Sequence, residues 1–518
     1  MFAIFPVFFI YSQNIHLLPL QELIFPLLLL VGFALSFWAI STFITKNSIK
    51  SGLFVSLFLV IFFSYGHIYN LLSGISVNEF ELDRHRFLLV PFFVAMILGI
   101  IFLIKTRRKL NNISKITNVI SVTIVLIVVF NVGVSISQEN YFDNTNVEKF
   151  LGVGASNESL LDVFSENNEK TNINIKSNAN PQHPDIYYII LDEYGSLPAL
   201  QYFFDYDNSL FISDLKKKGF FVISPSYTNY PTTVQSLGSS LNMEYINYLS
   251  DEAGVDSKNY HLLNQVLSKS NVMNMLQKEH YNIINMGALW GPNNEFSYVD
   301  KNLCEYKEIN RDSLMRELIQ ITMLSYVQER MVEDGRRDRV LCVFDEISKI
   351  QENFSSPKFV FAHIMLPHAP YIFGPNGEHI IPGNSLNSDP WNPKNAHVDQ
   401  IKFVNKKLTP LIENALNQNP NSIIILQGDT GSAFNGDWDF PSNDLIVERM
   451  SNLNAIYFPN KNYESFTNVK TPVNSFRIIF NEFFDETYPL LEDKMYWSTG
   501  NLPYLHDDVT AILLENET

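Results

Sequence analysis

Two aspartates each follow an apolar run that has the length of a buried strand. Asp192 comes directly after residues 186–191, and Asp429 follows residues 422–426 with Gln427 and Gly428 between them. Groups at the carboxyl ends of strands in an open α/β sheet meet in one crevice. Two carboxylates in that crevice would repel each other unless a cation lay between them. The pattern therefore predicts a divalent metal site, to which Glu193 adds a third carboxylate.

The segment after the second strand is QGDTG, residues 427–431, in which two glycines let the backbone turn sharply. A single Asp-Gly segment of this kind is more often an ordinary surface turn. Only its combination with the other polar residues supports a site.

Two threonines stand where a helix is predicted to begin. Pro231 fixes its own φ and favours the first turn of a helix, which places Thr232 or Thr233 at the helix amino terminus. The free N–H groups there suit a tetrahedral oxyanion, and a hydroxyl beside a metal ion can be activated as a nucleophile. The alternative is a threonine that only caps the helix.

Two histidines flank a short loop that contains prolines. His363 lies at the end of predicted strand 359–364, and His368 lies between Pro367 and Pro370. A neutral imidazole can bind a metal ion, and an imidazolium can bind a phosphate group or protonate a leaving group. A lone histidine after a strand is more often structural, whereas the pair favours a site in this loop.

From residue 184 onward, predicted strands alternate with amphipathic helices. The strands are expected at 186–191, 220–224, 281–286, 359–364, 422–426 and 454–458. The helices are expected at 209–218, 262–278, 311–332 and 398–415. This alternation predicts an α/β domain with a mostly parallel sheet between layers of helices.

The amino-terminal part is apolar and predicts a bundle of about five transmembrane helices. Residues 24–44, 53–72, 87–104 and 116–134 each approach the ~20 residues that a bilayer requires, and residues 1–11 form a shorter stretch. The stretches lack a signal-peptide cleavage pattern, and they hold almost none of the charges that mark a transport pathway.

Basic residues set the expected orientation of this bundle. Residues 105–115 carry five Lys or Arg and residues 45–52 carry two, whereas the loop after the first stretch has none. Positively charged loops stay in the cytoplasm, so the carboxyl-terminal domain should lie outside a cell membrane that the chain crosses several times. The predicted domains are 1–137 (transmembrane), 138–183 (a polar linker) and 184–518 (extracytoplasmic).

Charge and cysteine content limit the function further. The net charge of −17 argues against a nucleic-acid partner. Cys304 and Cys342 are the only cysteines, so a cysteine-rich zinc site is excluded. A disulfide between them and a pair of buried thiols are equally compatible with the sequence.

Four motifs in order resemble the alkaline phosphatase superfamily, in particular its membrane-anchored, sulfatase-like branch. This branch includes lipoteichoic acid synthases and phosphoethanolamine transferases. The motifs are LDEYG with Asp192, NYPTTVQSLGSSLN at 229–242, HIMLPHAPY at 363–371 and QGDTG at 427–431. The resemblance covers about residues 184–510 and implies an alkaline-phosphatase-like α/β/α sandwich behind a set of membrane helices.

The resemblance also implies roles for individual residues. Asp192 and Asp429 would bind the metal ion, and Thr233 would be both ligand and nucleophile, with Thr232 as the alternative. The two histidines would lie at the substrate, with His368 contacting the transferred group or leaving oxygen and His363 beside it. Asn229, which opens the threonine motif, would bind substrate.

One position departs from the family pattern. The family has Asp-His-Gly where this chain has Asp429, Thr430 and Gly431, so an imidazole ligand is replaced by a weaker hydroxyl donor. Glu193 could complete a site of oxygen ligands together with Thr430, which would favour Mg²⁺, Ca²⁺ or Mn²⁺ over Zn²⁺. Alternatively, His363 or His368 could move in, or the site could be degenerate in a non-catalytic envelope protein.

The sequence thus predicts a metal-dependent transferase or hydrolase acting on phosphodiester, or sulfate ester, groups of envelope lipids or glycans. Transfer from a phospholipid head group is favoured, because a domain tethered beside the bilayer meets head groups at high effective concentration. Sulfatase chemistry is disfavoured, because the C/S-x-P-x-R context of those nucleophiles is absent at Thr232 and Thr233.

Overall fold

The computed structural model describes residues 2–13, 20–72, 76–77, 80–81, 85–106, 110–138, 183–288, 293, 295–305, 313–380 and 394–515. The chain forms two compact units. One contains Met1–Asn174 and Lys307–Val332, and the other contains Ile175–Tyr306 and Glu333–Thr518. The predicted linker 138–183 lies outside the described residues except at its two ends, so its boundaries stay a prediction.

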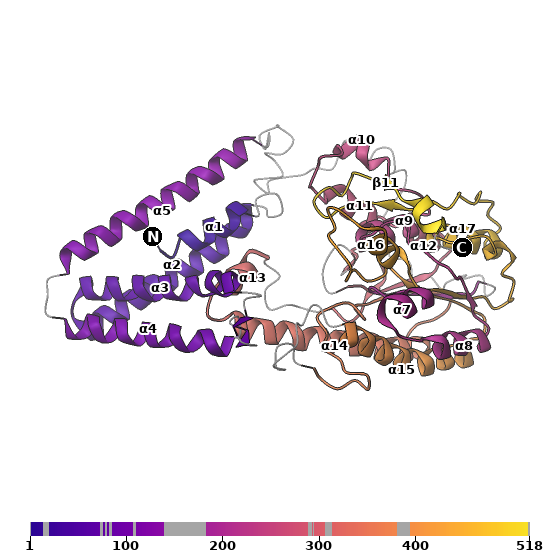
Figure 1. Cartoon of the computed structure of the whole chain (residues 1–518), viewed down its shortest axis with the longest axis horizontal. Coiled ribbons are helices and arrows are strands. Elements are labelled where there is room, and N and C mark those ends of the chain that lie inside the picture. The colour runs from indigo at the N-terminus through magenta and orange to yellow at the C-terminus, as the bar shows by residue number, and fades with distance from the viewer. Residues whose placement is uncertain are drawn as a thin grey trace, which may run out of the picture. The chain divides into compact units, whose positions relative to one another are not determined.

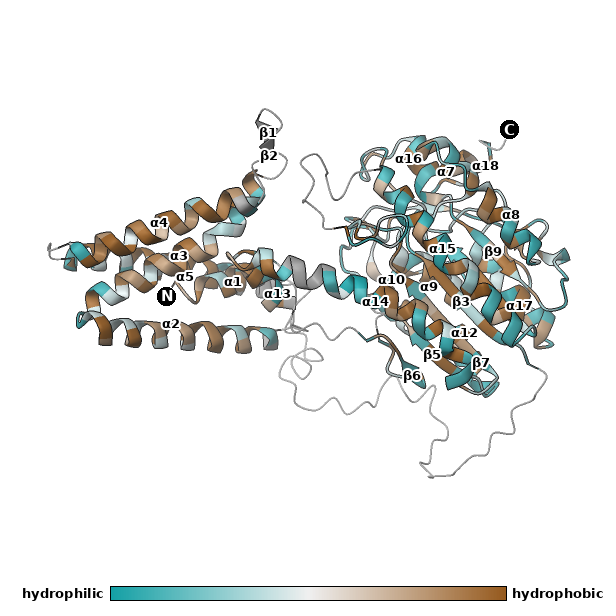
Figure 2. Cartoon of the chain, turned by 90° about the horizontal axis from the view of Figure 1, so that it is seen from below, coloured by the Kyte–Doolittle hydropathy of each residue, from teal (hydrophilic) through white to brown (hydrophobic). Residues whose placement is uncertain are grey.

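Within the described residues of the first unit, four helices are long and apolar enough to cross a membrane. They are α2 (Ile24–Thr45), α3 (Ser48–Leu72), α4 (His85–Lys105) and α5 (Asn111–Gln138). Their hydrophobic residues cover most of their length in Figure 2. The prediction of about five spans is one too many, because α1 (Phe5–Gln13) has only nine residues. At a rise of about 1.5 Å per residue, a helix of this length is too short to cross the roughly 30 Å hydrocarbon core of a bilayer.

A short helix from late in the sequence also belongs to this unit. In α13 (Ser313–Gln320), Leu314 and Leu318 pack in the same buried cluster as Val7 and Ile10 of α1. The sequence predicted one helix over 311–332 within the α/β alternation. Instead, α13 ends at Gln320 and α14 (Ser325–Asn353) begins after a turn, so that prediction is wrong.

The second unit is built on a seven-stranded sheet with the order β4-β9-β8-β3-β7-β5-β6. The central strand β3 (Asp185–Leu191) pairs in parallel with β7 (Lys358–Ile364) and β8 (Ser422–Gly428). Parallel pairing continues to β5 (Asn282–Met286) and β6 (Lys301–Asn302), whereas β9 (Asn454–Tyr457) is antiparallel to β8 and β4 (Phe221–Val222) is antiparallel to β9. The prediction of a mostly parallel sheet is confirmed.

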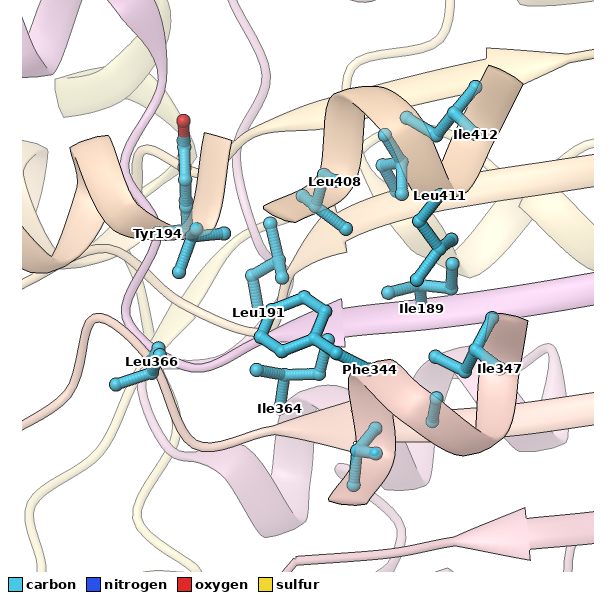
Figure 3. Close-up of a cluster of buried hydrophobic side chains, with 14 of the residues drawn as sticks. Ile189, Leu191, Tyr194, Phe344, Ile347, Ile364, Leu366, Leu408, Leu411 and Ile412 are labelled. Atoms are coloured by element: carbon cyan, nitrogen blue, oxygen red, sulfur yellow. The ribbon is translucent and has the colours of Figure 1, made fainter. Parts of the chain in front are cut away.

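Helices cover both faces of this sheet (Figure 1). Alternate residues of β3 point to opposite faces: Ile189 and Leu191 pack under α14, α15 (Lys394–Gln418) and α8 (Ser209–Lys217). Figure 3 shows these two residues facing Phe344 of α14 and Leu408 of α15. Tyr188 and its neighbours pack under α9 (Thr233–Asn242), α12 (Asn271–Lys278) and α17 (Ser475–Phe483). The predicted α/β/α sandwich is therefore confirmed.

The single helix predicted over 262–278 is two helices, α11 (His261–Ser268) and α12. Ser270 separates them, because its hydroxyl accepts a hydrogen bond from Met273 N at 3.1 Å and caps α12. The remaining helices are α7 (Leu197–Phe204), α10 (Leu249–Ala253), α16 (Asn443–Met450) and α18 (Thr510–Glu515). The remaining strands are β1 (Ser76–Val77), β2 (Phe80–Glu81), β10 (Tyr496–Trp497) and β11 (Asp507–Asp508).

Cys304 and Cys342 form a disulfide, with their Cα atoms 5.8 Å apart. The sequence had left a disulfide and two thiols open. The two cysteines flank residues Lys307–Val332, which include α13 and belong to the first unit. The disulfide therefore joins the two points at which the chain leaves and re-enters the sequence of the second unit.

Candidate functional site

The carboxyl ends of the three central strands bring together a cluster of possible metal ligands. Asp192 follows β3, His363 is the penultimate residue of β7, and Asp429 follows β8. Ligand atoms of these three side chains lie within 4.8 Å of one another, and all three residues are buried. Parallel pairing produces this convergence, because the strand ends are in register.

Asp429 is the most strongly held member of the cluster. Its Oδ1 accepts hydrogen bonds from the main-chain N–H of Glu193 at 3.0 Å and of Thr430 at 2.8 Å. Its Oδ2 accepts from the Thr233 hydroxyl at 2.6 Å, and its carbonyl oxygen accepts from the Ser236 hydroxyl at 2.6 Å. The two contacts from α9 fix the helix amino terminus against the end of β8.

The structure separates the two candidate threonines. Thr233 is the first residue of α9 and reaches Asp429, whereas Thr232 is the extended N-cap residue and donates to Gln235 Oε1 at 2.7 Å. The geometry thus favours Thr233 as the hydroxyl beside the carboxylates. Its role as nucleophile stays a prediction.

The electrostatics of the cluster are compatible with a bound cation. Burial and the neighbouring Asp429 raise the pKa of Asp192 well above its ordinary value. Burial lowers the pKa of His363 to about 4, so its ring is neutral at pH 7. Among the described residues, Asp192 Oδ1, His363 Nε2 and Thr430 Oγ1 are buried without a hydrogen-bond partner. Unpaired polar atoms at a buried cluster with two carboxylates fit a divalent metal ion.

Glu193 does not belong to this cluster. Its carboxylate pairs with Arg449 at 2.6 Å and lies 3.8 Å from His368 Nε2. Burial opposes ionisation, but the charges of His368 and Arg449 hold the pKa of Glu193 below its ordinary value. Its φ of +61° is rare for a side chain of this size, and its N–H bonds Asp429. The hypothesis that Glu193 replaces the missing ligand therefore finds no support in this arrangement.

His368 lies beside the cluster and is held by its own loop. Its main-chain N–H donates to Asp192 O at 3.1 Å, and its Nδ1 engages the carbonyl of Ala369. Although burial opposes a charged ring, the carboxylates of Glu193 and Asp192 raise the pKa of His368. The ring therefore holds a proton more readily than a free histidine does.

Arg449 joins the segments that carry the site, and the sequence analysis missed it. Its guanidinium donates to Pro231 O at 2.7 Å and to Gly431 O at 2.8 Å, in addition to Glu193. These partners precede α9, follow β8 and follow β3. Nothing in the sequence distinguishes this arginine, which ends an ordinary amphipathic helix.

Asn229 is engaged elsewhere in the fold. Its Nδ2 donates to Lys494 O at 2.9 Å, and its Oδ1 accepts from Val473 N at 3.1 Å. Both polar atoms of the amide thus form hydrogen bonds with main-chain groups near the carboxyl end of the chain, and neither bonds to the metal-ligand cluster. Its predicted contact with substrate stays a prediction.

The two glycines of the QGDTG segment are required by close packing. A Cβ on Gly428 would lie 2.3 Å from Tyr194 O, and one on Gly431 would lie 2.1 Å from Glu448 O. Neither glycine has a positive φ. The sequence analysis attributed them to a sharp turn, whereas their function is to let neighbouring main chain approach Asp429.

An open pocket adjoins the amino terminus of α9. Its volume is about 370 Å³, and it is lined by Thr232, Trp438, Asp439, Gly500 and Asn501. The guanidinium of Arg449 lies over the ring of Trp438, with its Cζ atom 5.0 Å from the ring centroid.

Comparisons with solved structures found proteins of low similarity. The C-terminal periplasmic domain of EcEptC from Escherichia coli is 14% identical over 64% of this chain and 94% of its own, with a TM-score of 0.40. The lipooligosaccharide phosphoethanolamine transferase A (EptA) from Neisseria meningitidis is 12% identical over 92% of each chain, with a TM-score of 0.37. These values are too low to assign a function.

A comparison with curated protein sequences found no match. The family model named Sulfatase matches residues 184–476, which include all four motifs and the whole metal-ligand cluster. Because this match covers more than half of the 518 residues, the chain belongs to the sulfatase family.

Proposed function

We propose that the protein is a membrane-anchored, metal-dependent transferase that moves a phospho-group through Thr233. Family membership supports an enzyme of the sulfatase or phosphotransferase kind. The observation that carries the finer proposal is the 2.6 Å hydrogen bond from the Thr233 hydroxyl to Asp429, inside a buried cluster of carboxylates and imidazole. An ordinary helix cap would instead bond the main chain of its own helix.

Asp192, Asp429 and Thr233 would hold the metal ion. A bound divalent ion lowers the pKa of a neighbouring hydroxyl and neutralises charge that develops on a phosphoryl oxygen. Mn²⁺, Mg²⁺, Zn²⁺ and Ca²⁺ are all compatible with this composition. Asp429 orients the hydroxyl, and the free N–H groups of the first turn of α9 would stabilise the negative charge of the phosphoryl oxygens.

His368 would act as the general acid. In the first step the Thr233 hydroxyl would pass its proton to Asp429 Oδ2, to which it is hydrogen-bonded, and Oγ would bond to phosphorus. The bond from phosphorus to the leaving oxygen breaks, and that oxygen takes the proton from His368. In the second step an acceptor hydroxyl gives its proton to His368 and bonds to phosphorus, the bond from phosphorus to Thr233 Oγ breaks, and Oγ takes its proton back from Asp429. The raised pKa of His368 beside Glu193 supports this role.

The open pocket beside Thr232 would receive the substrate. The donor we propose is a phospholipid head group, and the acceptor an envelope glycan or lipid. Four helices that can span a membrane keep the domain near such head groups. Hydrolysis is the nearest alternative, because water could resolve the same covalent intermediate, and a sulfate ester is an alternative substrate.

The disulfide and the basic loops support an extracytoplasmic domain. Disulfides persist in oxidising compartments and are rare in the cytoplasm. A cysteine introduced at Leu210, which is 86% exposed on α8, should react with a membrane-impermeant maleimide in intact cells. A cysteine at Lys46, between α2 and α3, should not react. Labelling of position 46 but not of position 210 would show that the domain lies on the cytoplasmic side instead.

The decisive experiment is turnover of a nitrophenyl phosphodiester by the purified full-length protein with added metal. Thr233→Ala should reduce kcat by roughly 10³-fold or more, as loss of a nucleophile does. Thr409→Ala on α15 is the matched control, because its hydroxyl contacts Asp214 instead of the cluster. If Thr233→Ala turns over like the control, Thr233 is not the nucleophile. If the wild type neither binds metal nor turns over substrate, the non-catalytic alternative holds.

A further inference from the structure

The distance between His363 and Asp192 suits two ligands of one ion better than it suits a hydrogen bond. His363 Nε2 lies 3.6 Å from Asp192 Oδ2, which is too long for a hydrogen bond. Two ligands in a tetrahedron around Zn²⁺, each about 2.0–2.2 Å from the metal, are about 3.3–3.6 Å apart. The two atoms are thus already spaced like ligands of a common ion.

The atoms that face this gap are unpaired. His363 is 1% exposed and Asp192 is 3% exposed, so bulk water cannot form hydrogen bonds with their side chains. Within the described part of the chain, His363 Nε2 and Asp192 Oδ1 have no hydrogen-bond partner. A buried polar atom without a partner costs about 1–3 kcal/mol, so two of them at one point are expected where a ligand normally binds.

The other nitrogen of the ring has one specific partner. His363 Nδ1 lies 2.9 Å from Asn293 Nδ2, and Asn293 is itself buried. When this amide N–H donates to Nδ1, a neutral ring carries its proton on Nε2. When Asn293 turns its Oδ1 toward the ring, the proton moves to Nδ1 and the Nε2 lone pair is free for a metal ion.

We propose that His363 is the nitrogen ligand of this chain's metal site, in place of the imidazole that Thr430 lacks, and that Asn293 is its positioning residue. The inference rests on the proposed function, because it requires a metal ion between Asp192 and Asp429. It assigns the ligand to a different strand: the nitrogen comes from β7 instead of from the residue after Asp429.

The carbonyl of Asn293 lies very close to Gly287. A Cβ on Gly287 would lie 1.4 Å from Asn293 O, so only glycine allows the two segments to meet. Arg339 donates from Nε to Gly287 O at 3.1 Å and fixes the same segment. The carbonyl of Asn293 therefore packs on a glycine whose position is fixed without a metal ion, and the Asn293 side chain reaches His363 from there.

The test is binding of Mn²⁺ alone to the metal-free, full-length protein in detergent. Free Mn²⁺ is counted by its EPR signal, and pulsed EPR detects ¹⁴N coupled to the bound ion. The wild type should show ¹⁴N coupling. His363→Ala should lose it and bind at least about 100-fold more weakly, and Asn293→Ala should weaken binding by about 10–100-fold.

Three further variants separate ligation from folding. Asn293→Asp should restore binding relative to Asn293→Ala, because a carboxylate accepts the Nδ1 proton in the ligating tautomer. Adding Thr430→His to His363→Ala should restore ¹⁴N coupling, because it returns an imidazole to the family's position. His261→Ala, at an exposed position of α11, should bind Mn²⁺ like the wild type.

The failures are distinguishable. A wild type that binds no Mn²⁺ overturns the proposed function and this inference with it. A wild type that binds Mn²⁺ without ¹⁴N coupling, or a folded His363→Ala that binds Mn²⁺ equally well, overturns the inference alone.

Discussion

Replacement of Arg449 by methionine should weaken both the stability and the activity of the second unit. Arg449 is 6% exposed, and its guanidinium makes three hydrogen bonds, to the Glu193 carboxylate and to the carbonyls of Pro231 and Gly431. Methionine keeps the hydrophobic volume but leaves a nearly buried carboxylate without its cation. Breaking a buried ion pair from one side typically costs about 3–5 kcal/mol, and we expect a loss in this range.

For a domain of this size we expect the apparent Tm to fall by about 5–10 °C. The loss should be measured on the full-length protein in detergent by intrinsic fluorescence. Because Arg449 ties together the segments that carry Thr233, Asp192 and Asp429, kcat/KM should fall by about 10²-fold, the effect of displacing reacting groups by about 1 Å.

The matched control is Arg477→Met. Arg477 also bonds two carbonyls, of Met243 and Pro489, and lies over a tyrosine ring, but it pairs with no carboxylate of the site. Combining Arg449→Met with Glu193→Gln should recover part of the lost Tm, because the unpaired charge is removed as well. The reasoning fails if Arg449→Met destabilises the protein no more than Arg477→Met, or if the double variant recovers nothing.

Three further perturbations test the framework beneath the site by the same Tm measurement. Lys358→Met should cost about 3–5 kcal/mol, because it strands Asp185, whose ion pair at 2.9 Å is fully buried, and adding Asp185→Asn should relieve part of that loss. The double change Cys304→Ser and Cys342→Ser should cost about 4 kcal/mol, since the bond closes a loop with a sequence separation of 38 residues. Gly431→Ala should lower both Tm and metal affinity, because its Cβ would lie 2.1 Å from a carbonyl oxygen that cannot move away freely; an unchanged affinity would show that Asp429 tolerates the shift.

The sequence alone determined where the central strands and the membrane-spanning helices lie, and which strand ends carry the candidate metal ligands. Apolar runs of strand length mark β3, β7 and β8, and the polar residues at their carboxyl ends are Asp192, His363 and Asp429. Runs of about 20 apolar residues mark the four helices that can span a membrane. These features follow from local periodicity, which each segment carries in its own residues.

Element boundaries were less accessible where a single side chain interrupts a pattern. Ser270 splits a predicted helix by capping α12, and the predicted helix 311–332 is interrupted between α13 and α14. At Ser270 the cap outweighs periodicity, because its hydroxyl satisfies a main-chain N–H group of the first turn of α12.

Only the tertiary structure decided which side chains meet. It brought Thr233 instead of Thr232 to Asp429, paired Glu193 with Arg449, set Asn293 against His363 and joined Cys304 to Cys342. Each of these contacts joins residues 38 to 256 positions apart. Such contacts depend on how helices and strands pack around a common core, and no local pattern of residue types encodes that packing.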